Sequence, residues 1–358
     1  MENIRILAIN PGSTSTKVAV YNNTKSAFLK NIKHSAKDLS GFSRITDQYE
    51  FRKKFIIDEL KDAGIDITSV NAVIGRGGLV KPIPSGVYEV NKAMLDDLRK
   101  GYLGEHASNL GGLIASDIAG TIPSARAFIA DPVVVDELQD EARIAGHPLF
   151  ERRSIFHALN HKAIGRTHAE SIDKQYDELN LIIAHLGGGI SVGAHKKGRV
   201  IDVNNALDGE GPFSPERSGT LPAGCLARIC YDSKYSLEDV MKIITGCGGF
   251  MAYFNTNDAY EIEIRAKDGD PKAILIQNAM SYQIGKEIGA MSAVLKGEVD
   301  AIILTGGIAH NPLLVSYVRD MVAYIAPVVI YPGEDEMKAL AMNVLMVLTG
   351  KMQAKVYR

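Results

Sequence analysis

The sequence has 358 residues, a formal net charge of −2 and 46% hydrophobic residues. This length allows two domains with large cores, and the balanced charge argues against nucleic acid as a partner. No apolar run of about 18 residues predicts a membrane span and no secretory leader precedes the first strand, so we expect a cytoplasmic protein. The cysteines lack Cys-x-x-Cys spacing and are expected to be reduced thiols, not metal ligands: Cys225, Cys230 and Cys247.

The chain opens with a predicted strand–turn–strand unit, whose strands cover residues 4–9 and 17–22. Its turn reads Asn10-Pro11-Gly12-Ser13-Thr14-Ser15-Thr16-Lys17. Hydroxyls and backbone N–H groups around a glycine turn form a cradle for an anion, and the lysine adds a positive charge. A Walker A loop is excluded because no second glycine precedes Lys17 and a strand follows instead of a helix. An ordinary Ser/Thr-rich hairpin turn remains the alternative.

Strand-like and helix-like segments then alternate, as is typical of α/β proteins. Hydrophobic periodicity predicts helices over 47–63, 91–100 and 106–119. Short buried strands are predicted over 72–74 and 127–130, and they end at Arg76-Gly77-Gly78 and Asp131-Pro132. A long polar stretch over 135–154 is expected to cross to a second domain.

The second half repeats the opening pattern. After a predicted helix over 157–171, residues 181–194 form a strand, a glycine turn and a strand, with His185-Leu186-Gly187-Gly188-Gly189 at the turn. Two such hairpins indicate an internal duplication of the fold. The remaining predicted elements are a long helix over 271–296, a strand from Asp300 to Gly306-Gly307, a helix that starts at Asn311-Pro312, a strand over 328–331, and a last helix after Gly333-Glu334-Asp335-Glu336.

Four motifs in this order carry a resemblance to a known family: Asn10–Lys17, His185–Ser191, Arg217-Ser218-Gly219 and Thr305-Gly306-Gly307-Ile308. Over essentially the whole length, the chain resembles the acetate and butyrate kinase family of the actin-like phosphotransferases, and most of all its butyrate kinase branch. The resemblance implies an α/β, duplicated two-domain actin/hexokinase-like (ribonuclease H-like) fold. We expect a first domain over 1–135 plus 337–358, a second over 136–336, and a cleft that closes to exclude water.

The resemblance also implies a reaction: reversible, Mg²⁺-dependent transfer of the γ-phosphoryl group of ATP to a short-chain fatty acid, giving ADP and an acyl phosphate. Butyrate or a branched acid is the expected acceptor, and a homo-oligomer is the expected assembly. Acetate or propionate kinase is one alternative. A sugar or polyol kinase of the same superfamily is another, and a nucleotide sensor or chaperone ATPase is a third, for which the chain has no room for an appended module.

The expected nucleotide contacts come from the glycine turns. By the resemblance, they are Asn10, Ser13, Thr14, Ser15, Lys17, His185, Gly187, Gly188 and Gly189, with Gly306 and Gly307 beneath the adenosine. Acetate kinases usually carry Asn where this chain has Gly188, which removes a side-chain donor and points to the butyrate branch. The helix that starts at Pro312 is expected to direct its positive end at the phosphates, although a buried glycine pair at a tight turn would also explain Gly306-Gly307.

Two arginines are expected to hold the acceptor and the transferring phosphoryl group. Arg76 and Arg217 lie beside glycines, and a guanidinium grips a carboxylate or a phosphate through two hydrogen bonds. His157 matches a family histidine that stabilises the phosphoryl group, and His106 and His185 match others nearby. Surface arginines and satisfied core histidines are the alternatives.

The glycines after Arg76 are expected to set the length of the acid. Acetate kinases carry bulky branched residues there, whereas this chain has Gly77-Gly78, which would leave room for a longer tail. Gly77 is therefore a predicted substrate-binding residue, and Gly77→Val is expected to shift the preference toward acetate.

The predicted Mg²⁺ site comprises Asn10, Ser13, Asp131 and Glu336. Asn10 can orient a metal-bound water without adding a negative charge that would repel an anionic acceptor, or it caps its own turn. Asp131 follows a buried strand, where α/β enzymes place chemistry. Because a carboxylic acid is already ionised at pH 7, we expect Asp131 to orient Mg²⁺ rather than act as a base, unless it only caps the turn before Pro132. For Glu336, an acidic helix start is the alternative.

Overall fold

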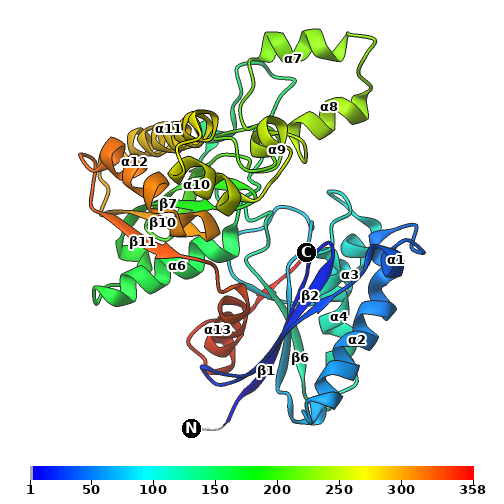
Figure 1. The fold of residues 1–358 in the computed structure, drawn as a ribbon. Coiled ribbons are helices and arrows are strands. Elements are labelled where there is room, and N and C mark those ends of the chain that lie inside the picture. Colours follow the sequence, from blue (N-terminus) through cyan, green and yellow to red (C-terminus); the bar gives the residue numbers. More distant parts are fainter. Residues whose placement is uncertain (1–2) are drawn as a thin grey trace. The chain divides into compact units, whose positions relative to one another are not determined.

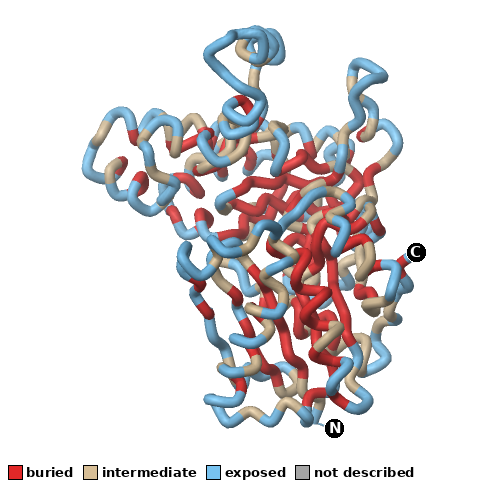
Figure 2. The backbone as a smooth tube through the Cα atoms, turned by 90° about the vertical axis from the view of Figure 1, so that its right-hand side faces the viewer, coloured by how far each residue is buried: buried red, intermediate tan, exposed pale blue. Residues whose placement is uncertain are grey.

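The computed structural model describes residues 3–358 and divides into two compact units. The first unit contains the chain up to Val135 together with Asp335–Arg358, and the second unit contains Asp136–Glu334. Each unit is built around one β-sheet with its own hydrophobic core (Figure 1). The buried backbone follows the strands of these sheets, as Figure 2 shows.

The sheet of the first unit has the strand order β12-β5-β6-β4-β1-β2-β3. Its centre is an antiparallel meander followed by two parallel strands: β1 (Arg5–Pro11), β2 (Ser15–Asn22), β3 (Lys25–Lys33), β4 (Ala72–Arg76) and β6 (Arg126–Ala130). β5 (Val87–Glu89) and β12 (Lys355–Val356) extend the sheet beyond β6. β3 was not predicted, because it is a mostly exposed edge strand without an apolar alternation.

Helices cover both faces of this sheet. Figure 1 shows α13 (Glu336–Leu348) on one face and α2 (Tyr49–Asp62), α3 (Lys92–Lys100) and α4 (Asn109–Gly120) on the other. The helix predicted from residue 106 begins only at Asn109, because residues 106–108 form a turn in which the Ser108 N–H donates to His106 Nδ1. Shorter pieces are α1 (Ala36–Leu39), η1 (Ile45–Gln48) and η2 (Ile67–Ser69).

The sheet of the second unit has the order β11-β10-β7-β8-β9. β7 (Asn180–Leu186), β8 (Ile190–Lys196) and β9 (Arg199–Val203) form the meander, and β10 (Ala301–Gly306) and β11 (Val328–Pro332) run parallel to β7. This is the arrangement of β6-β4-β1-β2-β3 in the first unit. The predicted duplication of the fold is confirmed.

The helices of the second unit include several that the sequence analysis did not assign. The predicted ones are α6 (Ala158–Ser171), α11 (Pro271–Val294) and α12 (Pro312–Val322). The others are α5 (Asp140–Arg143), η3 (Tyr176–Glu178), α7 (Ala223–Cys230), α8 (Leu237–Ile244), α9 (Gly249–Phe254), α10 (Ala259–Lys267) and η4 (Gly307–His310). Within the described chain, no helix has the length and apolarity needed to cross a membrane.

Candidate active site

The first predicted phosphate loop is a tight turn between β1 and β2. The Gly12 N–H donates to the Ser15 carbonyl at 2.8 Å, and the adjoining strands pair Asn10 with Lys17. Ser13 and Thr14 are exposed at the tip of the turn, as is Lys17 at its base, while Ser15 is half-buried. The hydroxyls and the ammonium group are thus accessible on a turn whose backbone is fixed by its own hydrogen bonds.

Arg52 of α2 holds this loop, and the sequence analysis missed it. Its side chain is only 1% exposed, and Nη1 donates to the carbonyls of Gly12 and Ser15 at 2.7 and 3.0 Å, while Nη2 donates to the Ser13 carbonyl at 3.0 Å. Gln48 accepts from the other edge of the guanidinium. Burial lowers the pKa of Arg52 to about 10. Arg52 therefore clamps three carbonyls of the loop at once.

Three predicted residues of the first unit meet where β1 and β4 end. Asn10 Nδ2 donates to Glu336 Oε2 at 2.5 Å, and Arg76 Nη1 lies 3.0 Å from Glu336 Oε1. Asn10 is the next-to-last residue of β1, Arg76 ends the parallel strand β4, and Glu336 is the first residue of α13. Parallel strands bring their carboxyl ends to one edge of a sheet, which is where these side chains converge.

Asp131 follows β6 directly, but its carboxylate is bound to a neighbouring turn. It is 2% exposed, and Oδ1 accepts from the Ser85 hydroxyl at 2.6 Å and from the Gly86 N–H at 2.8 Å. Its φ of +39° is unusual for a residue with a side chain. Oδ1 of Asp131 therefore fixes the turn at Ser85 and Gly86.

Gly77 is surrounded by packed side chains, whereas the sequence analysis expected open space beside it. A Cβ at this position would lie 2.6 Å from Pro132 Cβ and 3.3 Å from Ile129 Cδ1. The side-chain direction at residue 77 therefore points into packed protein, and the expectation that the missing bulk makes room for a longer acid is wrong. His106 is exposed, and its Nδ1 lies 2.8 Å from the Ser108 hydroxyl.

In the second unit, the glycine loop between β7 and β8 lies against Arg217 and His157. The Gly187 N–H donates to the Gly189 carbonyl at 3.1 Å. A Cβ at Gly189 would lie 2.1 Å from Arg217 Nη1 and 3.4 Å from His157 Cε1, whereas a Cβ at Gly188 would meet only Glu216 Oε1 at 3.9 Å. Gly189 is therefore the position that admits the guanidinium.

Arg217 is a buried cation with an unused donor. Its Nη1 donates to the Ala206 carbonyl at 2.5 Å, and its buried Nε has no hydrogen-bond partner among the described residues. Burial lowers the pKa of Arg217, and the nearby Glu216 carboxylate opposes that shift. Because an unsatisfied buried donor is costly, an anion bound there would stabilise this arrangement.

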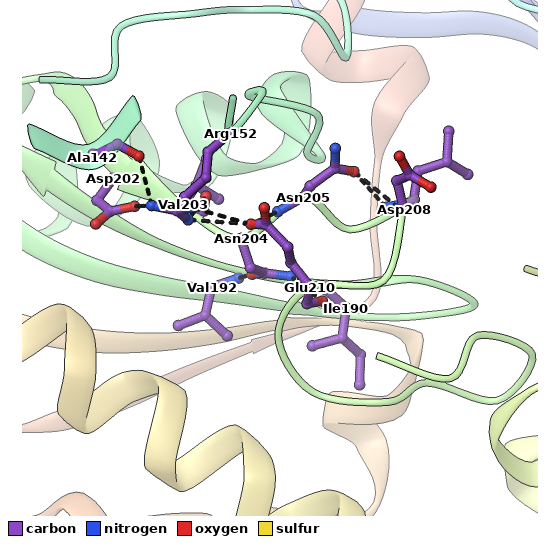
Figure 3. A network of polar contacts seen from close by, with 11 residues as sticks. Ala142, Arg152, Ile190, Val192, Asp202, Val203, Asn204, Asn205, Asp208 and Glu210 are labelled. Atoms are coloured by element: carbon purple, nitrogen blue, oxygen red, sulfur yellow. Dashed lines mark hydrogen bonds and ion pairs between the residues drawn. The ribbon is translucent and has the colours of Figure 1, made fainter. Parts of the chain in front are cut away.

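The loop that presents Ala206 to Arg217 is anchored by a polar network around Arg152 (Figure 3). Arg152 donates to Asp202 at 3.0 Å and to Glu210 at 3.2 Å, and Glu210 also accepts from the Asn205 N–H at 3.0 Å. Asn204 ties the same loop to β8, since its Oδ1 accepts from the Val192 N–H at 2.7 Å. The sequence analysis assigned no role to this network.

The two predicted histidines of this unit are stacked. His157, which precedes the first turn of α6, lies with its ring 3.8 Å from that of His185 at an interplanar angle of 17°. His185 Nδ1 is 2.9 Å from Asn160 Oδ1, and its Nε2 is 3.5 Å from Glu334. A Cβ at Gly187 would lie 2.9 Å from His185 Nε2, so this glycine also admits a ring.

Gly306 and Gly307 differ in what they allow. Gly306 has a φ of +91°, and a Cβ there would lie 2.4 Å from the Leu186 carbonyl oxygen, so only glycine fits. A Cβ at Gly307 would meet nothing within 4 Å. The start of α12 is capped by Asn311, which accepts from the N–H groups of Leu313 and Leu314.

The comparisons with known proteins decide the family. The model of the acetokinase family matches residues 146–330. Butyrate kinase 2 of Clostridium acetobutylicum is 54% identical over 354 residues, and butyrate kinase 1 of the same organism is 55% identical, each alignment covering 99% of both chains. The chain belongs to the acetokinase family. The predicted family is confirmed, and members are carboxyl-group phosphotransferases that use ATP or ADP.

Solved structures confirm the actin/hexokinase-like fold of this acetokinase-family chain. The acetate kinase of Porphyromonas gingivalis has a TM-score of 0.78 at 19% identity, covering 96% of this chain and all of that one. A propionate kinase from Francisella tularensis has a TM-score of 0.76 at 19% identity, covering 95% of this chain and 98% of that one. At such identities the likeness concerns the fold alone.

The acidic groups of this acetokinase fit Mg²⁺ only as part of a larger set. Over residues 3–358, no three His, Cys, Asp or Glu side chains are grouped so that they could hold a metal ion. Mg²⁺ in kinases needs one or two carboxylates, with water and substrate phosphates completing its octahedron. Glu336 with Asn10 meets that need, whereas Asp131 Oδ1 already accepts from Ser85 and Gly86.

The structure thus gathers eight of the predicted residues into two groups. Asn10, Arg76 and Glu336 are in mutual contact in the first unit, and His157, His185, Gly187, Gly189 and Arg217 adjoin one another in the second. Arg52 could have been found from sequence, because it lies one and two helical turns from Ile56 and Leu60 on the apolar face of the helix predicted over 47–63. A charged residue at a core-facing position calls for a buried partner.

Proposed function

We propose that this chain is a butyrate kinase, which transfers the γ-phosphoryl group of ATP to the carboxylate of butyrate or a similar short-chain acid. The products are an acyl phosphate and ADP, and the reaction is reversible. The identity of 54–55% over 99% of two butyrate kinases carries this proposal. The two groups of site residues supply the chemistry that such a reaction needs.

The second unit is proposed to bind the phosphates. At Gly187–Gly189 the backbone is open to close approach, and Arg217 offers the buried Nε donor that lacks a partner among the described residues. In phosphoryl transfer the charge spreads over the three equatorial oxygens, so catalysis consists mainly of positioning and of fixed donors aimed at those oxygens. Arg217 and His157 are the proposed donors.

The first unit is proposed to bind the acid. Arg76 contacts Asn10 and Glu336 through Nη1, and its Nε and Nη2 form a fork that suits a carboxylate. Glu336 fixes the orientation of this guanidinium, and Asn10 is bonded to Glu336. The hydroxyl loop Ser13–Ser15 with Lys17 offers donors for an anion beside Asn10.

Mg²⁺ is proposed to bind with the nucleotide. Glu336, Asn10, Ser13 and Asp131 are the residues that would hold it, directly or through water. The ion would neutralise phosphate charge as the reaction proceeds. Chelation of divalent cations is therefore expected to abolish turnover, and added Mg²⁺ to restore it.

Two alternatives remain as outcomes of the test. An acetate or propionate kinase would use the same residues with a shorter acid. A sugar or polyol kinase would need Asp131 as a general base, but this carboxylate is bound to Ser85 and Gly86, an arrangement that suits a fixed structural or metal-orienting role better. The expected homo-oligomer and the cytoplasmic location also stay predictions, and sedimentation velocity would test the first.

The deciding experiment traps the acyl phosphate with hydroxylamine. The protein is incubated with ATP, Mg²⁺ and a panel of acids from two to six carbons, with glucose and glycerol as hydroxyl acceptors. A hydroxamate signal that peaks at four or five carbons supports the proposal. A peak at two or three carbons supports an acetate or propionate kinase, and ADP released with a polyol but no hydroxamate supports a sugar kinase.

Arg217→Ala is expected to lower kcat by about 10²–10³, like the loss of one preorganised donor.

A further inference from the structure

A continuous chain of polar contacts runs through the second unit from Tyr176 to His157. The Tyr176 hydroxyl lies 2.5 Å from His195 Nδ1, and His195 Nε2 lies 3.1 Å from His161 Nδ1. His161 Nε2 is 2.9 Å from the Ser191 hydroxyl, which in turn is 2.8 Å from His157 Nδ1. We call these five side chains the histidine relay. It links η3, α6 and β8 to a residue of the candidate active site.

The interior of the relay is fully buried, and its two histidines are neutral. His161, His195 and Ser191 are all 0% exposed. Burial lowers the pKa of both histidines well below the usual range, and Lys162 adds to the effect in each case. A neutral imidazole carries one proton, so each ring donates through one nitrogen and accepts through the other. The direction of any one hydrogen bond therefore sets the direction of the next.

One contact fixes that direction. A phenol is a better hydrogen-bond donor than acceptor toward a neutral imidazole, so the Tyr176 hydroxyl donates to His195 Nδ1 across their 2.5 Å contact. His195 then carries its proton on Nε2 and donates to His161 Nδ1. His161 in turn carries its proton on Nε2 and donates to the Ser191 hydroxyl oxygen.

The other end of the relay follows from the same rule. Because the Ser191 hydroxyl oxygen accepts from His161, its own proton is available for His157 Nδ1. A neutral His157 whose Nδ1 accepts carries its proton on Nε2. We propose that the histidine relay is a positioning device that holds His157 as the Nε2–H tautomer, so that its Nε2 presents a donor to a phosphoryl oxygen. The reverse direction would turn the same nitrogen into an acceptor, which would repel that oxygen.

The kinetic meaning of this inference rests on the proposed function, whereas the tautomer itself does not. Tyr176→Phe removes the first donor of the relay and leaves the ring in place. In the free protein labelled with ¹⁵N-histidine, the ring nitrogen shifts of His157 are expected to report Nε2–H in the parent and a mixture of tautomers in the variant. A His157→Gln variant assigns the signals. This readout needs no substrate, so it stands even if the acceptor is another acid.

The turnover of Tyr176→Phe is expected to fall by about 10- to 100-fold, less than the loss of about 10⁴ known for a fully misplaced catalytic tautomer. KM for ATP and for the acid should change less than about twofold, because the geometry of binding is kept. Tyr331→Phe is the matched control, since the Tyr331 hydroxyl also bonds a buried histidine of α6, His168 Nδ1 at 3.2 Å, outside the relay. It is expected to leave kcat and the His157 signals unchanged.

Ser191→Ala is a second, independent test, because it removes the hydroxyl that joins His161 to His157 at the other end of the relay. It is expected to release the His157 tautomer and to lower kcat as Tyr176→Phe does. The double variant should lose little more than either single variant, because members of one unit are not additive. Unchanged His157 tautomer signals in either variant, additive losses in the double variant, or an equal loss in Tyr331→Phe would overturn the proposal.

Discussion

At the scale of single residues, two neighbouring glycines make a sharp comparison. A Cβ at Gly189 would lie 2.1 Å from Arg217 Nη1, whereas a Cβ at Gly188 would have 3.9 Å to its nearest neighbour. We expect Gly189→Ala to displace the guanidinium and lower kcat by about 100-fold, the order of one lost donor. Because the atom displaced is the end of a side chain, thermal stability should change little.

Gly289→Ala is the control, because a Cβ at this position of α11 would meet nothing within 4 Å, and it is expected to retain near-parental kcat. Steady-state kinetics and a melting curve on the two variants make the test. A Gly189→Ala protein with parental turnover would show that the position of Arg217 next to this loop does not matter for the reaction.

Arg52 gives a second prediction at this scale. In Arg52→Lys, a single ammonium replaces a guanidinium that serves three loop carbonyls, and we expect the free energy of unfolding to drop by about 1–3 kcal/mol per carbonyl left unsatisfied. A loosened phosphate loop should also lower kcat/KM by up to about 100-fold. Urea denaturation and kinetics measure both effects.

The control is Arg126→Lys in the same unit. Arg126 pairs with Glu89 through exposed side chains, so its replacement should cost less than about 0.5 kcal/mol. Equal losses in Arg52→Lys and Arg126→Lys would argue against the clamp.

The residues that sequence could and could not place differ in what their neighbours reveal. Asn10, Gly189 and Arg217 lie in motifs whose order along the chain carried the resemblance. Gly77 looked like a pocket residue because the sequence shows which side chain is missing but not the direction in which it would point. The contacts of the histidine relay depend on the register of β8 and on the rotation of α6 about its axis. A short sequence motif does not reveal either of these.

At the scale of elements, the segment 204–217 links a polar network to the buried arginine. Glu210 accepts from Arg152 and from the Asn205 N–H, and the same segment supplies the Ala206 carbonyl to Arg217. Removal of this carboxylate in Glu210→Ala should cost about 1.5–3 kcal/mol, the scale of a hydrogen bond to a charged group. It should also reduce kcat, because the acceptor that orients Arg217 would move. Urea denaturation and steady-state kinetics measure the two effects.

Glu238→Ala is the control, since it removes a carboxylate from an exposed ion pair with Lys242 one turn away on α8. Its stability should change by less than about 0.5 kcal/mol, with unchanged kcat. If both variants have parental kcat, the network of Figure 3 stabilises the fold without orienting Arg217.

The elements themselves were largely predictable where a periodic pattern was strong. Helices α2, α6 and α11 have buried residues that recur along the helix, and strands β1, β7 and β10 are almost continuously buried. β3 and α7 were missed because β3 is mostly exposed and no residue of α7 is buried, so neither carries a core-facing pattern to read.

At the scale of the whole molecule, buried histidines give the protein a predictable sensitivity to acid. Burial lowers the pKa of His34, His161, His168 and His195 from 6.5. Below pH 6.5 the histidines of the unfolded chain become protonated, whereas the buried histidines of the folded chain stay neutral. The free energy of unfolding is therefore highest above that pH and decreases as the pH falls. Each fully buried histidine should contribute a slope of about 1.4 kcal/mol per pH unit.

Guanidinium denaturation midpoints at pH 7.5 and 5.5 test this expectation. His195→Gln should reduce the pH dependence by about one histidine, and His147→Gln, at an exposed position, should not alter it. A midpoint that rises on acidification would contradict the expected direction of the effect.

The order of the chain through the two units has a consequence for synthesis. The second unit is one uninterrupted segment, whereas α13 and β12 of the first unit are synthesised after the whole of the second unit. Glu336 belongs to that later segment, so the partner of Asn10 and Arg76 is made only after the second unit. The nascent polypeptide consequently carries a finished second unit before the first can close its sheet, and a premature stop after Glu334 would leave the β1–β4–β6 face without its cover.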